Sequence, residues 1–450
     1  MAKQPKRSAT DRVYPRDLAA TLLRTWNPEP FFEGWPRVEL PPKAVLGQFL
    51  DVCYHASMLT EEGRPTVFRI VLQDSKSPVS PRHGEELPPV TRYTFTKPIP
   101  FTETELRRLA PVADPRKVLI AVESTGEGDQ AQLQIYGLVD IGMALWEMAR
   151  HERVMGHSSP EALVVVSTRP GELSISRGDR PVVRLRDGRI VSPTDSVLHE
   201  GPIAEFFSPA STVFINNACQ LAEIDQDPDE DDGLRMAHQT FIESLLLYTA
   251  DLHHGGTLLF VPEEMAHDDP RLLSRVSIKY VLPSTRPRDA LVSAMAARLQ
   301  HNAVMTSLED RKTVKIEVLQ ALEALAEREQ ECDDAAKDAA RFIASLTAVD
   351  GAVVLTDTLR IIGFGAEVIA APAATDTVHI AQTAQGDESR PIEFTEFGTR
   401  HRSAYRFTAG LDNSVAFVLS EDGGIKAVRQ VGPRLLLWPY FNIGFVTALT

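Results

Sequence analysis

The stretch F-G-T-R-H-R-S-A-Y-R, residues 397–406, places Arg400, His401 and Arg402 directly after a glycine and a threonine. Thr399 adds a hydroxyl, and the small residues that follow favour a helix start, where free backbone N–H groups attract anions. Forked cations, a hydroxyl and backbone amides are the groups that bind a polyphosphate. Taken alone, the stretch fits a basic helix edge on the surface equally well.

Upstream, residues 349–355 read V-D-G-A-V-V-L, with Asp350 directly before an apolar run typical of a buried strand. Gly351 and Ala352 add little bulk, so a ligand can approach the backbone there. A carboxylate at a strand end can bind a divalent cation that bridges phosphates, or orient a sugar hydroxyl. Asp-Gly alone most often marks a turn. This motif therefore indicates a binding site only in combination with the motif of residues 397–406.

Downstream, residues 419–426 read L-S-E-D-G-G-I-K. They begin within the last two residues of the predicted strand 414–420. Ser420 and Glu421 close that strand and offer a hydroxyl and a carboxylate. We expect these groups to lie on the same rim as the other two motifs.

These three motifs, in this order, resemble the diadenylate cyclase (DAC, DisA_N-type) domain over residues 303–450. The resemblance implies an α/β domain with a central mixed sheet flanked by helices. It implies a metal-dependent nucleotidyltransferase that condenses two ATP into cyclic di-AMP and two pyrophosphates, with Mg²⁺ or Mn²⁺. Each domain binds one ATP, so two domains must meet face to face in a homodimer or higher oligomer.

The resemblance also assigns roles to individual residues. Asp350 would bind the metal and help to activate the ribose 3′-hydroxyl. The remaining positions would line the nucleotide, hold its phosphates or touch the triphosphate tail: Gly351, Ala352, Thr399, Arg400, His401, Arg402, Ser420 and Glu421.

Two features depart from the family pattern. The polar segment 372–396 lengthens the chain between Asp350 and Arg400, as a lid or as a change to the base pocket or dimer face. Val349 stands where some members carry a histidine. Base specificity and activity level therefore stay open, as does an alternative function: a catalytically silent receptor that binds a nucleotide or cyclic dinucleotide in the same pocket.

The preceding chain reads as a mixed α/β region over residues 14–300, after a loose basic tail, residues 1–13. Helices are predicted over 16–26, 43–59, 101–110, 143–154 and 236–256. Strands are predicted over 66–74, 117–124, 133–141, 162–170, 171–178, 181–191 and 257–264, and a surface loop over 74–98. Thr102 and Glu105 have capping-box spacing. Segments such as L-P-P-V-T-R-Y-T-F and I-Y-G-L-V-D-I-G resemble the sensor domain called DACNV, which implies an unknown small-molecule ligand.

Composition excludes several classes of function. The chain has 450 residues and a formal net charge of −15, which disfavours nucleic acid as a partner. Three scattered cysteines argue against a disulfide framework and a cysteine-based zinc site. The acidic run 225–233 lacks the calcium-loop spacing, and the adjacent His253 and His254 suit a helix end better than a metal. No signal peptide and no membrane span are read, so we expect a cytoplasmic protein.

Overall fold

The structure is a computed structural model. It describes the following residues: 13–29, 37–77, 91–113, 117–126, 128, 131–141, 160–167, 169–178, 180–186, 188–191, 197–224, 232–252, 254–308, 315–370, 377–394, 397–420 and 424–439. Three predictions therefore lie outside or almost outside the described residues, namely the tail 1–13, the helix 143–154 and the acidic run 225–233. The site residue Glu421 also lies outside them.

The chain divides into two compact units, one of residues 1–194 with 448–450 and one of residues 195–447. The boundary predicted near residue 300 is therefore corrected. Strands β11 (Gly256–Val261) and β12 (Val276–Ser284) pair with strands that lie beyond residue 350, so they belong to the C-terminal sheet. The mixed α/β class predicted for both regions is confirmed.

The N-terminal unit contains a sheet whose eight described strands run in the order β10-β9-β8-β7-β3-β5-β6-β4. Its elements are α1 (Pro15–Thr25), α2 (Lys43–Ser57), β1 (Thr60–Glu61), β2 (Arg64–Pro65), β3 (Phe68–Leu72), β4 (Thr91–Pro100), α3 (Glu103–Leu109), β5 (Val118–Thr125), β6 (Gln132–Asp140), β7 (Leu163–Ser167), β8 (Leu173–Arg177), β9 (Arg180–Arg186) and β10 (Arg189–Val191). Strands β3 and β5 are parallel, and the other described pairs in this sheet are antiparallel.

Helices α1, α2 and α3 contribute to the core on one face of this sheet, where Leu18, Phe49 and Leu106 are buried with Ile70 and Ile120. The predicted N-cap of α3 is confirmed, since Thr102 Oγ1 accepts a hydrogen bond of 3.3 Å from the backbone N–H of Glu105. The surface loop predicted over 74–98 is wrong at its C-terminal end, where β4 pairs with β6.

The C-terminal unit contains a sheet whose nine described strands run in the order β12-β14-β13-β11-β17-β18-β19-β15-β16. Besides β11 and β12, its elements are α5 (Gly201–Ala222), α6 (Asp232–Asp251), α7 (Pro270–Leu273), α8 (Arg286–Leu308), α9 (Ile316–Leu346), β13 (Ala352–Thr356), β14 (Ile361–Val368), β15 (Thr377–Ala381), β16 (Ser389–Glu393), α10 (Thr399–Gly410), β17 (Val415–Leu419), β18 (Ile425–Val431) and β19 (Arg434–Trp438). Every residue of β11, β13 and β17 is buried, as expected for central strands covered on both faces.

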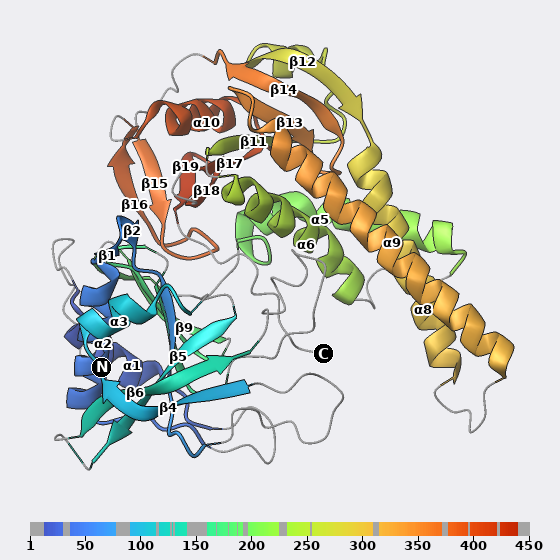
Figure 1. The fold of residues 1–450 in the computed structure, drawn as a ribbon. Coiled ribbons are helices and arrows are strands. Elements are labelled where there is room, and N and C mark those ends of the chain that lie inside the picture. Colours follow the sequence, from blue (N-terminus) through green and yellow to red (C-terminus); the bar gives the residue numbers. More distant parts are fainter. Residues whose placement is uncertain are drawn as a thin grey trace, which may run out of the picture. The chain divides into compact units, whose positions relative to one another are not determined.

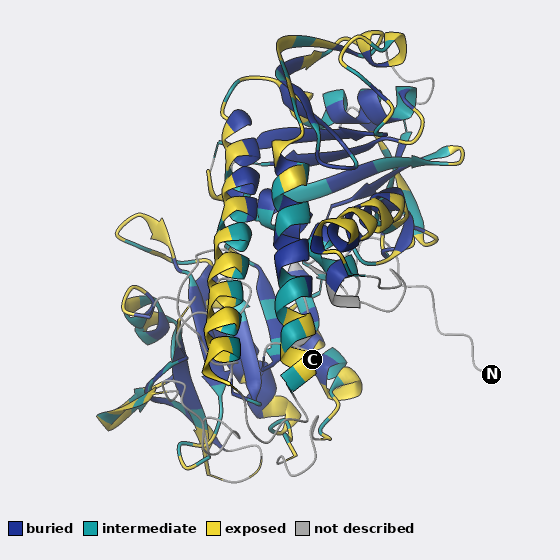
Figure 2. Ribbon diagram, turned by 90° about the vertical axis from the view of Figure 1, so that its right-hand side faces the viewer, coloured by how far each residue is buried: buried dark blue, intermediate teal, exposed yellow. Residues whose placement is uncertain are grey.

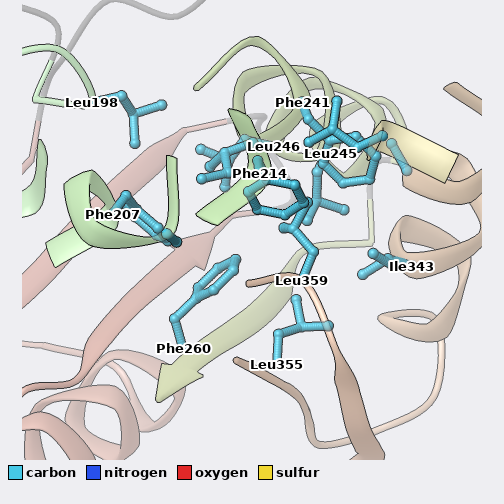
Figure 3. Packing of buried hydrophobic residues seen from close by; sticks show 14 of the residues in the cluster. Leu198, Phe207, Phe214, Phe241, Leu245, Leu246, Phe260, Ile343, Leu355 and Leu359 are labelled. Atoms are coloured by element: carbon cyan, nitrogen blue, oxygen red, sulfur yellow. The ribbon is translucent and has the colours of Figure 1, made fainter. Parts of the chain in front are cut away.

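Helix α10 lies on one face of this sheet, and α5, α6 and α9 lie on the other (Figure 1). On the α10 face, Tyr405 and Phe407 pack with Val418 and Val428. On the opposite face, Phe207 and Phe214 pack with the strand residue Phe260 (Figure 3). This three-layer arrangement fixes α10 over the centre of the sheet.

Helices α8 and α9 form a long antiparallel pair (Figure 1). The fully buried positions of α9 begin at Ala336, whereas residues nearer its start, such as Ile316 and Leu319, are exposed. Figure 2 shows that both long helices expose much of their outer surface. Glu329 joins the two helices through ion pairs with Arg298 and His301.

Candidate functional site

The motif of residues 397–406 forms the first turns of α10, which begins at Thr399 and not at the predicted start, Ser403 and Ala404. Gly398 is the N-cap with φ −66° and ψ 166°, and its carbonyl accepts from the backbone N–H of Arg402 at 3.1 Å. Any residue can adopt this backbone conformation. What glycine contributes is open space, because a Cβ at Gly398 would meet no atom within 4 Å. Thr399 and Arg400 are exposed, whereas His401 and Arg402 are half-buried.

The first turn of α10 is anchored to the sheet by apolar side chains one turn further on. Ala404, Tyr405 and Phe407 are fully buried. The rings of Phe397 and Tyr405 flank the His401 imidazole, with centroids 6.2 Å and 6.4 Å from it. The polar groups of the motif are therefore presented from a rigid base, and the imidazole lies between aromatic rings and the sheet edge.

Lys426, at the start of β18, contacts this motif directly. Its Nζ lies 3.0 Å from Nε2 of His401. Because an ammonium only donates hydrogen bonds, Nε2 must be the acceptor, and the His401 proton then resides on Nδ1. Lys426 is the last residue of the stretch 419–426, but the sequence alone did not predict a role for it. Hairpin pairing of β17 with β18 was the available signal, because it sets Lys426 opposite Val418, two residues before Ser420.

Strand register brings Asp350 to the same edge of the sheet. Leu258 of β11 pairs with Val353 of β13 on one side and with Phe417 of β17 on the other. Two residues toward the edge, Gly256 pairs with Leu419. Asp350, two residues before the first residue of β13, therefore lies near the level of Ser420, directly after β17. Two strand spacings separate them, which corresponds to about 10 Å.

Gly351 is required by the backbone at this edge. Its φ is +114°, and a Cβ built there would lie 2.6 Å from the carbonyl carbon of Gly365 in β14. Ala352 follows as the buried first residue of β13. The glycine thus allows β13 to begin against β14 with the Asp350 side chain exposed.

Ser420 lies on the turn between β17 and β18, where its N–H donates to the carbonyl of Gly424 at 2.8 Å. It is half-buried, and it lies at the edge where Lys426 meets His401. The sheet edge therefore gathers one carboxylate, two hydroxyls and three cationic side chains, namely Asp350, Thr399, Ser420, Arg400, Arg402 and Lys426. Glu421, predicted to share this rim, lies outside the described residues.

These side chains suit a divalent cation that takes most of its coordinating oxygens from a bound ligand and few from the protein. In the described part of the chain, no cluster of three or more His, Cys, Asp or Glu side chains could hold a metal by itself. Mg²⁺ typically takes one or two protein carboxylates and completes its shell with phosphate oxygens and water. Asp350 fits that use, because it is exposed and lies at the edge that carries the cationic side chains.

The opposite ends of β11 and β13 carry a different polar cluster. Glu263 accepts from Arg360 Nε and Arg288 Nη1, each at 3.2 Å, and from the Thr358 hydroxyl. Burial raises the pKa of Asp357 to about 6. These contacts tie the two strand ends together, at the end of the strands away from Asp350.

The hairpin β15–β16 accounts for most of the segment 372–396. Strand β15 pairs parallel with β19 and antiparallel with β16, which extends the sheet at its edge. The added residues of this segment are therefore part of the sheet, and Trp438 Nε1 donates to the Thr383 carbonyl at 3.0 Å next to the hairpin.

One comparison with known proteins gives a match within the N-terminal unit. Residues 35–140 match the family model described as "Probable sensor domain DACNV". The DACNV match runs from the approach to α2 through β6, and so includes the parallel pair β3–β5. No curated protein and no solved structure gave a significant match. In the described part of the chain, no helix is long and apolar enough to cross a membrane.

Proposed function

We propose that the C-terminal unit is a diadenylate cyclase, which condenses two ATP molecules into cyclic di-AMP and releases two pyrophosphates. The observation that carries the proposal is the shared sheet edge of Asp350, the α10 N-terminus and Ser420. Their order along the chain is that of the diadenylate cyclase motifs. A receptor for the same ligands would need the cations but not Asp350 opposite them.

The chemistry requires groups that the edge contains. In each half-reaction a ribose 3′-oxygen attacks the α-phosphorus of the other ATP, the bond to the pyrophosphate oxygen breaks, and the 3′-hydroxyl proton is lost. Charge develops on the phosphoryl oxygens and on the leaving pyrophosphate, so catalysis depends on positioning and on cationic donors. Arg400 and Arg402 supply forked donors, and Thr399 with the free N–H groups of α10 supplies neutral ones.

Within this proposal, Lys426 and His401 have different roles at the phosphates. In the contact of 3.0 Å, Nε2 of His401 accepts a hydrogen bond from the Lys426 ammonium. The positive charge then resides on Arg400, Arg402 and Lys426. Lys426 is therefore a further phosphate-binding residue, which also fixes the orientation of the imidazole.

Asp350 is the acidic counterpart across the edge. It would hold the divalent cation and orient the 3′-hydroxyl for in-line attack, and the cation would neutralise charge on the phosphates. Because each bound ATP is both nucleophile and electrophile, two C-terminal units must face each other, which a twofold homodimer provides. One unit alone would bind ATP without closing the ring.

The DACNV match supports a regulatory role for the N-terminal unit, since the family is described as a probable sensor. In the proposed protein, the N-terminal unit binds a small molecule and changes the rate of cyclic di-AMP synthesis in the C-terminal unit.

The test is a product assay with the full chain. Purified protein is incubated with ATP and either Mn²⁺ or Mg²⁺, and nucleotides are separated by chromatography and identified by mass. We expect cyclic di-AMP and pyrophosphate in a ratio of one to two. Binding of ATP or cyclic di-AMP without any product, across metals and protein concentrations, would replace the enzyme by the receptor.

A further inference from the structure

A cavity of about 390 Å³ opens at one end of the N-terminal sheet. It lies at the carboxyl ends of the parallel strands β3 and β5 and at the start of β7, where Leu72 pairs with both Val122 and Leu163. Ligands of α/β sheets commonly bind outside the carboxyl ends of strands. This cavity has the volume of a small-molecule site and is lined entirely by residues of the N-terminal unit.

The walls of the cavity combine an apolar surface with carboxylates. Val38, Leu40, Pro41, Leu72 and Leu163 supply the apolar part. The charged lining residues are three acids, Glu39, Asp74 and Glu161, and one base, Arg37.

Two of these acids are already neutralised. Arg37 pairs with Glu39 at 3.2 Å, and Arg177 pairs with Glu161 at 2.9 Å. Among the described residues, the Asp74 carboxylate has no cationic partner and accepts only from the backbone N–H of Lys76, at 2.7 Å. Asp74 therefore leaves a negative charge at the rim of the cavity.

The loop that carries Asp74 is held in place from both sides. Glu123 Oε2 accepts from the backbone N–H of Ser75 at 3.1 Å, and Arg92 Nη2 donates to the Ser77 carbonyl at 2.7 Å. Burial alone would raise the pKa of Glu123, but hydrogen bonds from Ser75 and Gln134 outweigh it and lower that pKa. The ionised Glu123 adds a second negative charge close to Asp74.

We propose that this cavity binds a small organic cation, an ammonium group on an apolar body, with Asp74 as its counter-ion. The apolar body packs on Leu72 and Leu163, and the ammonium donates to the Asp74 carboxylate. Such a ligand is complementary in charge and in apolarity to the cavity. The inference concerns the N-terminal unit alone and holds whether or not the C-terminal unit makes cyclic di-AMP.

The test uses tryptamine as the probe, with indole-3-propionate as an anion of similar size. Binding to the full chain is measured by calorimetry for wild type and three variants. Asp74→Asn keeps the oxygen that accepts from Lys76 but removes the charge. Ser124→Phe fills the cavity from an exposed strand position. Asp51→Asn on α2 is the matched control outside the cavity.

We expect Asp74→Asn to weaken tryptamine binding about tenfold or more, which corresponds to one charged hydrogen bond. Ser124→Phe should abolish binding, Asp51→Asn should leave it within about twofold of wild type, and indole-3-propionate should bind at least about tenfold more weakly than tryptamine. Circular dichroism confirms that each variant is folded. The proposal is overturned if tryptamine fails to bind at millimolar concentration, if Asp74→Asn binds as wild type does, or if both probes bind equally.

Discussion

His401 on α10 and Lys426 on β18 lie 3.0 Å apart, from Nε2 to Nζ, and join the basic motif to the strand that follows Ser420. The lysine thus adds a cationic side chain that the basic motif itself does not contain. The proposed phosphate-binding edge is built from two segments of the chain.

Lys426→Met should therefore weaken the candidate site. Loss of one charged donor corresponds to roughly a tenfold to hundredfold fall in kcat/KM for ATP. Lys279→Met, an exposed lysine on the edge strand β12, is the matched control and should behave as wild type. An unchanged rate in Lys426→Met would contradict this role.

Gly351→Ala should destabilise the C-terminal unit by about 1–3 kcal/mol, because φ is +114° and the new Cβ would lie 2.6 Å from the Gly365 backbone. Gly398→Ala makes a matched comparison at the other motif, since its φ is −66° and its surroundings are open. It should cost about 1 kcal/mol or less. The unfolding free energy of both variants is measured with urea. An equal loss of stability at the two glycines would contradict the conclusion that the backbone at Gly351 requires glycine.

Stability at acidic pH should depend on His238 of α6. Its side chain is fully buried, with Nδ1 3.1 Å from Ser211 Oγ, and burial lowers its pKa to about 3. The unfolded chain takes up this proton below about pH 6.5 and the folded chain does not. The unfolding free energy should therefore fall as pH drops from 6.5 toward 3, by up to about 1.4 kcal/mol per pH unit from this group.

Asp357 acts in the opposite direction, because its pKa is raised by burial to about 6. The folded state then binds the proton first, so this group makes the fold more stable as pH falls from about 6 to its ordinary pKa near 4. The comparison of His238→Gln with wild type isolates the histidine, and His267→Gln, at an exposed position, is the control. Unfolding free energies that run parallel in pH for wild type and His238→Gln would contradict the assignment.

Synthesis of cyclic di-AMP should follow the fraction of dimer. Each half-reaction needs the phosphates of one unit and the ribose of the other, so a monomer binds ATP and makes no product. Specific activity measured over a dilution series should fall in parallel with the dimer fraction from sedimentation, while ATP affinity stays constant. A monomeric fraction with full specific activity would rule out the two-unit reaction.

Helices and strands that are determined by a few neighbouring residues could be predicted from the sequence. The Thr102–Glu105 spacing located α3, and the apolar run after Asp350 located β13. A helix was also predicted at the basic motif, although α10 begins at Thr399 and not at the predicted Ser403. In each case neighbouring residues alone decide the conformation.

Elements at the sheet edges were not predictable in this way. Pro98 and the polar residues of β4 read as loop, yet proline is tolerated in an edge strand such as this one. Strands β12 and β16 are likewise edge strands, in which most residues are exposed or half-buried. The pairing partner of β12 is β14, which lies far away in sequence, and this is why the domain boundary was placed too late. The role of Lys426 depended on the same kind of information.

The most direct measurement is cyclic di-AMP formation by wild type and Asp350→Asn, with ATP affinity measured on the same samples. The asparagine keeps the size of the side chain at an exposed position, so the fold should be unchanged. We predict product from wild type, a loss of about a hundredfold or more in Asp350→Asn, and ATP binding within a few-fold of wild type in the absence of metal. Equal product from both proteins, or no product from a wild type that binds ATP, would contradict the account.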